Sequence, residues 1–289
     1  MKVMRLAAAA ALVGTIAGMP GPAVAQDVAP DTLLERLLLP NPPSIYLSSL
    51  SSRAAPGSSS GSPSAFGPSW GDAFVGGGFQ IVRFTDRPDG SITTGFGLGN
   101  GRDLVGLEVD ITSLSTVRNG FFTRNALGFK LHRVLPGSVG FAVGWENAIV
   151  LGGETDGGNS LYGVVTKVMP LGLRGPDDLF NTITLSVGVG NGRFRTISEV
   201  RNEKEVVNVF ASAGLRVKKW ASVIADWPGQ DLTLGASFTP FKRIPIVVTP
   251  AFADLLGRVN DTPRFVVGAG MGFRFADLPG MFSSNHRSR

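Results

Sequence analysis

From position 70 onward the chain alternates between bulky apolar residues and residues that are small or polar. In VGFAVGWENAIVL, residues 139–151, the odd positions are large and mostly apolar, whereas the even positions include glycine, alanine and a glutamate. A repeat of two residues is typical of a β-strand, because successive side chains point to opposite faces of a sheet. The sequence therefore predicts an all-β protein. The same split returns at 105–111, 181–189, 231–239 and 265–275.

Turn residues separate the alternating segments. Asn-Gly, Pro-Gly and Asp-Gly pairs supply the backbone conformations of tight hairpin turns, and they recur between the apolar runs. We expect about twelve antiparallel strands, within a range of about ten to fourteen, joined mainly as hairpins in an up-and-down order. The predicted strands are 70–84, 91–99, 103–114, 121–133, 139–151, 160–168, 180–190, 205–217, 219–227, 230–239, 243–252 and 264–275.

The composition of the smaller, more polar face indicates how the sheet is oriented. In a soluble barrel or sandwich the apolar face points inward, whereas in an outer-membrane barrel it points outward into lipid. A water-exposed face is usually rich in Lys, Glu, Thr and Gln, but here it is mostly Gly, Ala, Ser and Thr with charges of both signs. This favours an antiparallel up-and-down transmembrane β-barrel, with a soluble periplasmic β-protein as the alternative. Candidate lumen-lining residues are Glu108, Asp110, Arg124, Lys130, Glu146, Lys167, Arg216 and Arg274.

The first 25 residues have the three parts of a secretory signal peptide. Lys2 and Arg5 form a basic start, LAAAAALVGTIAG is a short apolar run, and Ala23-Val24-Ala25 is a small-residue cleavage site. The run is too short to cross a bilayer as a helix, and no later uncharged apolar run predicts a transmembrane helix. Export and the mild formal net charge of +5 both argue against a nucleic-acid partner.

Residues 26–69 differ in composition from the segments that follow. DTLLERLLLP predicts a short amphipathic helix at 31–39, and the rest is rich in Ser, Pro, Gly and Ala, as flexible linkers are. We expect a flexible periplasmic extension, with a plug inside the lumen and a partner-docking helix as the alternatives. The barrel is predicted at 70–275, between the signal peptide (1–25) with its extension and a polar C-terminal tail at 276–289.

The chain contains no cysteine, which excludes disulfides and thiol chemistry, and 39 of its 289 residues are glycine. TGFGLGNGRD, residues 94–103, looks like a phosphate-binding loop, but its glycine spacing does not fit G-x-G-x-x-G. An alternating segment also follows it, in place of the helix that such a loop requires. We interpret its glycines as wall residues that let a barrel curve and leave space in the lumen, with Asn100-Gly101 as a hairpin turn.

The signal peptide, the alternating meander and the aromatic-rich final strand FVVGAGMGFRF together resemble the bacterial outer-membrane β-barrel class, in particular its small, functionally uncharacterised members. The resemblance covers residues 70–275, and it implies an outer-membrane location with membrane lipid as a partner. Members of this class often end in an aromatic residue that serves as an assembly signal, whereas here Phe275 is followed by ADLPGMFSSNHRSR. The signal would then be internal, at Phe273 and Phe275, or be supplied by Phe282, or assembly would differ.

Candidate catalytic residues are few. Some membrane-barrel hydrolases resemble one another in placing His and Ser two positions apart on a strand, but His132 is followed by Arg133 and Val134. The only H-x-S triplet lies in the predicted tail, at 286–288. From position 70 onward the sequence has no G-x-S-x-G elbow, no H-E-x-x-H and no His/Cys metal cluster. We therefore expect no enzymatic activity, no metal and no cofactor, and we expect His132 to lie in the lumen or at its rim.

Two predicted loops carry charge. GGETDGGN contains Glu154 and Asp156, and we interpret it as a solvated hairpin tip, not as a calcium site. The longest predicted loop, at about 193–205, reads RFRTISEVRNEKE. Long loops in outer-membrane barrels face outward, and they often carry recognition or constrict the mouth.

The charges of the smaller face leave two interpretations open. Opposed basic and acidic rows would produce a transverse field across a narrow pore, or the charges would pair and close the lumen. Our first functional hypothesis is a porin-like narrow channel or small-solute transporter, with ions or small solutes as partners. The second is a non-conducting structural or surface-interaction barrel, and the third is a lipid-modifying barrel enzyme.

Overall fold

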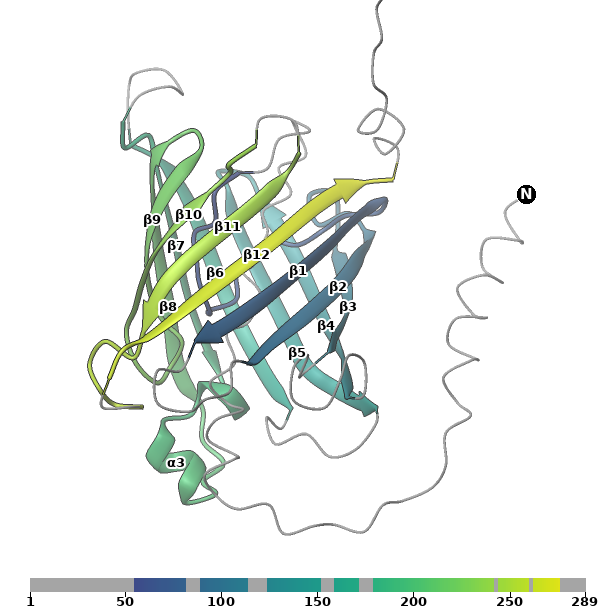
Figure 1. The fold of residues 1–289 in the computed structure, drawn as a ribbon. Helices are drawn as coiled ribbons and strands as arrows, with labels where there is room; N and C mark the ends of the chain where they lie inside the picture. The colour runs from purple at the N-terminus through teal and green to yellow at the C-terminus, as the bar shows by residue number, and fades with distance from the viewer. Residues whose placement is uncertain are drawn as a thin grey trace, which may run out of the picture.

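The computed structural model describes residues 55–81, 89–113, 124–151, 159–171, 179–241, 244–259 and 262–275. These residues form twelve strands that close into one antiparallel barrel (Figure 1). Each strand pairs with its neighbours in sequence, and β1 pairs with β12 to complete the ring. The predicted all-β, up-and-down barrel is therefore confirmed. Among the described residues, no helix is long and apolar enough to span a bilayer.

Each predicted segment overlaps one observed strand, and the differences lie at the strand ends. β3, for example, begins at Gly106 and not at 103, because residues 101–103 form a turn. β2 finishes at Gly99 as predicted, where a φ of 68° starts that turn. Two short helices, η1 (Gly192–Phe194) and α3 (Ile197–Arg201), lie between β7 and β8. The strands are β1 (Asp72–Ile81), β2 (Asp89–Gly99), β3 (Gly106–Ser113), β4 (Asn125–Leu135), β5 (Val139–Leu151), β6 (Ser160–Pro170), β7 (Thr182–Gly190), β8 (Asn208–Lys218), β9 (Ala221–Trp227), β10 (Thr233–Phe238), β11 (Ile246–Ala253) and β12 (Arg264–Arg274).

The two ends of the barrel are different. β1 begins and β12 finishes at one end, where Asp72 lies opposite Arg274, and we call this the terminal end. Because all neighbouring strands are antiparallel, β7 finishes and β8 begins at the other end, where α3 lies (Figure 1), and we call this the α3 end. Two residues, Lys219 and Trp220, are enough to join β8 to β9 at the terminal end.

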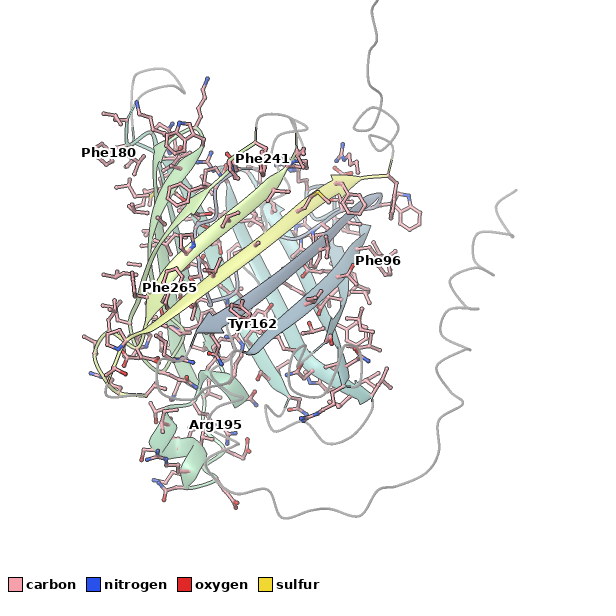
Figure 2. All side chains as sticks on the ribbon, in the orientation of Figure 1. Phe96, Tyr162, Phe180, Arg195, Phe241 and Phe265 are labelled. Atoms are coloured by element: carbon pink, nitrogen blue, oxygen red, sulfur yellow. The ribbon has the colours of Figure 1, made fainter. Side chains whose placement is uncertain are left out.

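Burial alternates along the strands as the sequence pattern predicts. Val143 is 57% exposed, whereas the neighbouring Ala142 and Gly144 are buried. Large apolar side chains such as Phe96 project from the outer surface, and Phe180 and Phe241 lie at the end opposite Arg195 (Figure 2). The inward positions are mainly Gly, Ser, Thr and Ala, so the core of this protein is polar and lies within the lumen.

Residues 55–69, which we call the strap, lie inside the barrel. Ser59 and Ala65 are completely buried, and strap residues contact inward-facing side chains of several strands. The prediction of a periplasmic extension over 26–69 is therefore wrong for the strap, and the alternative of a plug inside the lumen applies to it. The predicted signal peptide, the helix at 31–39 and the tail at 276–289 lie outside the described residues.

Candidate functional site

The strap crosses the lumen from the β8–β10 wall to the β2–β4 wall. At its start, the backbone N–H of Gly57 donates to Ser237 Oγ at 2.7 Å, and the Ser222 hydroxyl donates to the Gly57 carbonyl. Farther along, the Ala65 N–H donates to Thr166 Oγ1 at 2.9 Å. These contacts distribute the strap over walls that are far apart in sequence, so it crosses the interior and does not line one side.

Asp226 holds the middle of the strap. The backbone N–H groups of Ser60, Gly61 and Ser62 donate to Asp226 Oδ2 at 2.6, 2.7 and 3.1 Å, and the Ser62 hydroxyl donates to Oδ1. Successive N–H groups of this kind form a concave donor site for an anion, and hydrogen bonds to an ionised acceptor are stronger than neutral ones. Asp226 is 1% exposed, so the strap supplies donors to a carboxylate that water barely reaches.

The strap leaves the lumen at the terminal end beside β2, β3 and β4. His132 Nε2 donates to the Pro68 carbonyl at 3.1 Å, because a carbonyl oxygen can only accept. Trp70 N–H then donates to the Gly99 carbonyl at 2.7 Å, and Asp72 begins β1. The predicted place of His132, in the lumen or at its rim, thus corresponds to a buried contact with the strap.

Glycines in the wall make room for the strap. A Cβ added at Gly97 would lie 2.3 Å from the Pro68 carbonyl oxygen, and one at Gly214 would lie 2.5 Å from Ser58 Cα. Both distances are shorter than any tolerated contact, so a larger residue in either place would displace the strap backbone. The wall is shaped around this segment.

A second closure lies at the α3 end, where residues 191–194, the inner turn, fold into the lumen between β7 and β8. Phe194 is completely buried, its ring stacks on Phe210 with centroids 4.4 Å apart, and it meets the edge of Tyr162 at 5.8 Å. Ala65 of the strap belongs to the same buried cluster. Side chains of both closures therefore belong to one buried apolar cluster with wall residues of β5, β6 and β8.

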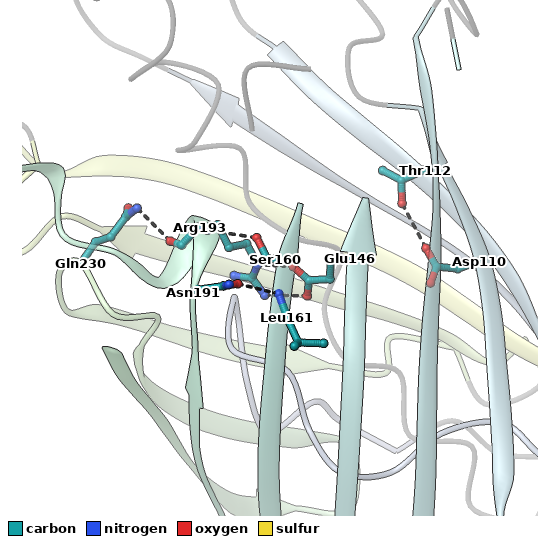
Figure 3. A network of polar contacts seen from close by, with 8 residues as sticks. All are labelled: Asp110, Thr112, Glu146, Ser160, Leu161, Asn191, Arg193 and Gln230. Carbon is teal, nitrogen blue, oxygen red and sulfur yellow. Dashed lines mark hydrogen bonds and ion pairs between the residues drawn. The ribbon is translucent and has the colours of Figure 1, made fainter. Parts of the chain in front are cut away.

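Arg193 fixes the inner turn to the wall. Its guanidinium forms two hydrogen bonds with Glu146, at 2.5 Å from Nε to Oε2 and 2.9 Å from Nη2 to Oε1, and lies 4.2 Å from the Phe194 ring centroid. Its backbone N–H donates to Ser160 Oγ at 3.0 Å, and its carbonyl accepts from Gln230 at 3.0 Å (Figure 3). This is a paired, stacked arginine, and pairing offsets the cost of removing both charges from water.

Several of the predicted lumen-lining charges are paired. Lys130 Nζ lies 2.6 Å from Glu108 Oε2, directly across β3 and β4, and Arg274 Nε donates to Asp72 at 2.8 Å. Asp110 accepts a hydrogen bond from Thr112 at 3.4 Å (Figure 3). The observed pairs agree with the alternative in which charges close the lumen. The inward register also contains Arg216, on β8, while Arg124 directly precedes β4, and both are half-buried.

Lys167 departs from the lumen prediction. It follows the outward register of β6, which exposes Leu161 and Val165, and its ammonium donates to the Gly137 carbonyl at 2.6 Å. The prediction failed because Lys167 was grouped with the small and polar positions by its own polarity. Val165 and Leu161, two and six positions before Lys167, point outward, and residues an even number of positions apart share one face of a strand, so Lys167 lies on the outer face.

Three important groups were not among the candidate site residues. Arg193 lies in the segment predicted as a long outward loop, and Asp226 was not among the predicted lumen-lining residues. Arg264 was overlooked: it is 6% exposed, bonds Asp254 and donates from Nη1 to Gln80 at 2.6 Å. A charged residue that begins an otherwise apolar strand was the available signal for Arg264.

The described residues contain no group of three or more His, Asp or Glu side chains arranged to hold a metal ion. The candidate calcium loop with Glu154 and Asp156 lies outside the described residues, so its interpretation stays a prediction.

Comparisons with known proteins add little to this geometry. No protein-family model matches the chain, and no curated protein matches it. Among solved structures, the crystal structure of Neisserial surface protein A is similar with 8% sequence identity and a TM-score of 0.18, and the match covers 71% of this chain and 95% of that chain. A likeness this weak carries no argument about function.

Proposed function

We propose that the protein is an integral barrel of the bacterial outer membrane that is closed at rest, and that it passes small solutes only when the strap is displaced. The membrane location is supported by the outward face, where Phe141, Val143 and Trp145 are each at least 44% exposed on one strand. Soluble monomers rarely expose continuous apolar surface on this scale, whereas lipid requires it.

The outward charges of the described strands are compatible with this location. Arg133 and Lys167 both lie close to the terminal end, where the Pro136–Ser138 turn joins β4 to β5 and receives the Lys167 ammonium. A Lys or Arg costs about 2–4 kcal/mol at the midplane of the bilayer but about 0–1 kcal/mol near its surface. The position of both residues therefore keeps the cost low.

We assign the α3 end to the cell exterior. The connection between β7 and β8, which contains η1 and α3, extends over 191–207, whereas the β8–β9 and β4–β5 turns at the terminal end are short. Outer-membrane barrels have longer loops outside and short turns in the periplasm. The inner turn is then the outer constriction, and the strap closes the periplasmic side.

The observation that carries the proposal is the occupation of the lumen by the strap. A segment of 15 residues, 55–69, lies where solute would pass, and it is held largely by hydrogen bonds that water can replace. We infer that passage requires withdrawal of the strap and movement of the inner turn, because two closures in series each block flow. A barrel in which neither moves is the second candidate, a structural or surface-interaction protein.

Gly61→Pro tests this proposal in planar bilayers. Proline has no N–H, so the variant loses one donor to Asp226, and Gly61→Ala is the matched control because its added Cβ would lie 3.8 Å from Pro228, an ordinary contact. We expect no steady conductance from the wild type or from Gly61→Ala. Gly61→Pro combined with Phe194→Ala should give channel events, with each single change giving fewer.

Strap position is measured separately in the same proteins. Ser59 is completely buried, and the chain has no cysteine, so a Ser59→Cys thiol reports strap withdrawal by its labelling rate. A double variant whose Ser59→Cys is labelled freely but which conducts nothing would favour the structural barrel. Recovery of the protein in the soluble periplasmic fraction, without heat-modifiable migration, would contradict the membrane location.

His132 enters this proposal as a strap contact and not as a catalyst. Its Nε2 is occupied by Pro68, and its ring packs against Gly67, where an added Cβ would lie 2.6 Å from it. We therefore keep the prediction that the protein is not an enzyme, and His132→Gln should change strap labelling without any change in the lipid composition of the host membrane.

A further inference from the structure

The wall recognises the main chain of the strap. Five backbone N–H groups of the strap, from Gly57, Ser60, Gly61, Ser62 and Ala65, donate to side chains of the wall. Two strap carbonyls, of Gly57 and Pro68, accept from the wall. Every peptide offers these same donors and acceptors, so the contacts select an extended backbone more than a sequence.

The wall also restricts the size of the side chains that fit. A Cβ added at Gly140 would lie 3.0 Å from the Ala65 methyl group and 3.2 Å from the Phe66 ring, and Gly214 lies beneath Ser58. The path that the strap follows is therefore narrow where it meets these glycines. Ser, Gly, Ala and Pro fit it, and they make up all of 55–69 except Phe66.

Charge complementarity indicates an uncharged occupant. The strap contains no Asp, Glu, Lys or Arg, and the wall cation Lys130 is already paired with Glu108, as Arg193 is with Glu146. Asp226 instead faces three consecutive N–H groups. An occupant of this path therefore has to offer several closely spaced donors to the Asp226 carboxylate. A peptide with free N–H groups at successive positions does so, whereas an oligosaccharide presents hydroxyls that lack this spacing.

We propose that the path vacated by the strap is a binding site for extended, uncharged peptides with small side chains, and that such peptides are the solute class of this barrel. The strap is then an internal occupant that resembles the solute. The proposal rests on the proposed function to the extent that the strap must be displaceable. It names Asp226 as the residue that binds the peptide backbone, together with Ser237 and Thr166.

The test measures binding of a fluorescent peptide with the sequence of residues 56–66 to the full Gly61→Pro chain in detergent, where Asp226 is intact. We expect saturable binding by fluorescence anisotropy. A peptide carrying the same Gly61→Pro change should bind at least about tenfold more weakly, because it lacks one hydrogen bond to a charged acceptor. Asp226→Asn in the host should weaken the original peptide similarly, and a neutral oligosaccharide of the same length should not compete.

A second measurement uses the unmodified strap, in case Gly61→Pro impairs folding. Excess peptide should accelerate labelling of Ser59→Cys in the otherwise wild-type chain, because free peptide competes with the strap by mass action. Equal binding of the proline peptide, equal binding of a peptide with lysine at both ends, or competition by the oligosaccharide would overturn the peptide site. No binding by a chain whose Ser59→Cys is freely labelled would also overturn it. A Ser59→Cys thiol that stays unreactive in every variant and at every peptide concentration would instead refute the displaceable strap, and the peptide site with it.

Discussion

The strap and the inner turn close the same lumen by different physical means. The strap leads into β1, and wall hydroxyls and the Asp226 carboxylate hold its backbone. The inner turn is tied at both ends, to β7 and β8, and is held by aromatic packing and a paired arginine. Water can replace the hydrogen bonds of the strap, but it cannot replace the packing of buried rings.

This difference assigns the two closures different roles. A hydrogen bond contributes only about 0.5–1.5 kcal/mol net, because the unbound groups bond to water, so a polar segment can leave a lumen that then fills with water. Removal of a buried ring from its cluster costs several kcal/mol because apolar surface is exposed and a cavity remains. The strap is accordingly the movable closure, and the inner turn is a constriction that shifts less.

Phe194→Ala should have the largest effect. Loss of a fully buried ring that stacks on Phe210 should lower the free energy of unfolding by about 3–5 kcal/mol. Urea titration in detergent, followed by heat-modifiable migration, measures this. Phe252→Ala is the control, since Phe252 faces outward and is 53% exposed. Equal losses in the two variants would show that the inner turn is not packed as a core.

Asp226→Asn should have the next largest effect, and it should act on the strap alone. The amide keeps the shape but removes the charge from hydrogen bonds that are each worth about 1.5–3 kcal/mol, so Ser59→Cys labelling should accelerate at least about tenfold. Asp231→Asn is the matched control: Asp231 is also buried and accepts N–H groups of Leu256 and Arg258, but these belong to the β11–β12 connection. Equal acceleration in both would mean that the strap follows general loosening of the barrel.

Thr166→Val should weaken the strap less, because it removes one neutral acceptor, the partner of the Ala65 N–H. The expected cost is about 1 kcal/mol, or roughly fivefold in the Ser59→Cys labelling rate. Thr166→Ser retains the hydroxyl and should behave as the wild type does. A Thr166→Val effect as large as that of Asp226→Asn would contradict the ranking of charged over neutral contacts.

The strands were predictable because each pattern is local. In β5, side chains alternate from Val139 to Trp145, before an irregularity near Asn147, and the outward or inward environment follows directly from parity. Glycines such as those at 95 and 97 were correctly placed on the inward side of β2, where Phe74 and the strap occupy the space that a Cβ would need. Closure through β1 and β12 follows from the even strand number and the hairpin order.

The closures were not predictable, because they depend on contacts between distant positions. A Ser/Pro/Gly-rich composition is as typical of a solvated linker as of a chain that threads a lumen, and only Asp226 and the wall glycines distinguish the two. The distance in sequence between Ser60 and Asp226 is 166 residues, and no periodicity reports such a pair. Arg193 was misjudged for the same reason, since its partner Glu146 lies on another hairpin.

The smallest expected effect is a change in the pH-dependent stability of α3, which lies outside the barrel and follows the inner turn. Thr196 and Glu199 form a capping box at the start of α3, in which the Thr196 N–H donates to Glu199 Oε2 at 2.8 Å. This bond, the Thr196 hydroxyl and the Asn208 amide lower the pKa of Glu199 below its ordinary value of 4.5. The pKa of Glu199 is therefore lower in the folded loop than in the unfolded chain. The ionised carboxylate stabilises the loop fully at a pH above the unfolded pKa, and this stabilisation is lost as the pH falls through the folded pKa.

Hydrogen exchange of the α3 amides, compared between about pH 3 and pH 7, should therefore show acid-induced loss of protection. Glu199→Gln should flatten that pH profile with little change at neutral pH, because glutamine still accepts from the Thr196 N–H and the site is exposed to screening solvent. Glu203→Gln removes the same charge from outside the capping box and should leave the profile unchanged. Ser59→Cys labelling should not respond to any of these changes, since the hydrogen bonds of Glu199 run to Thr196 and to Asn208 of β8 and not to the strap. A strap that loosens together with α3 in acid would mean that the strap is coupled to the β7–β8 connection, which contains the inner turn, and that the comparison between a movable strap and an inner turn that shifts less is wrong.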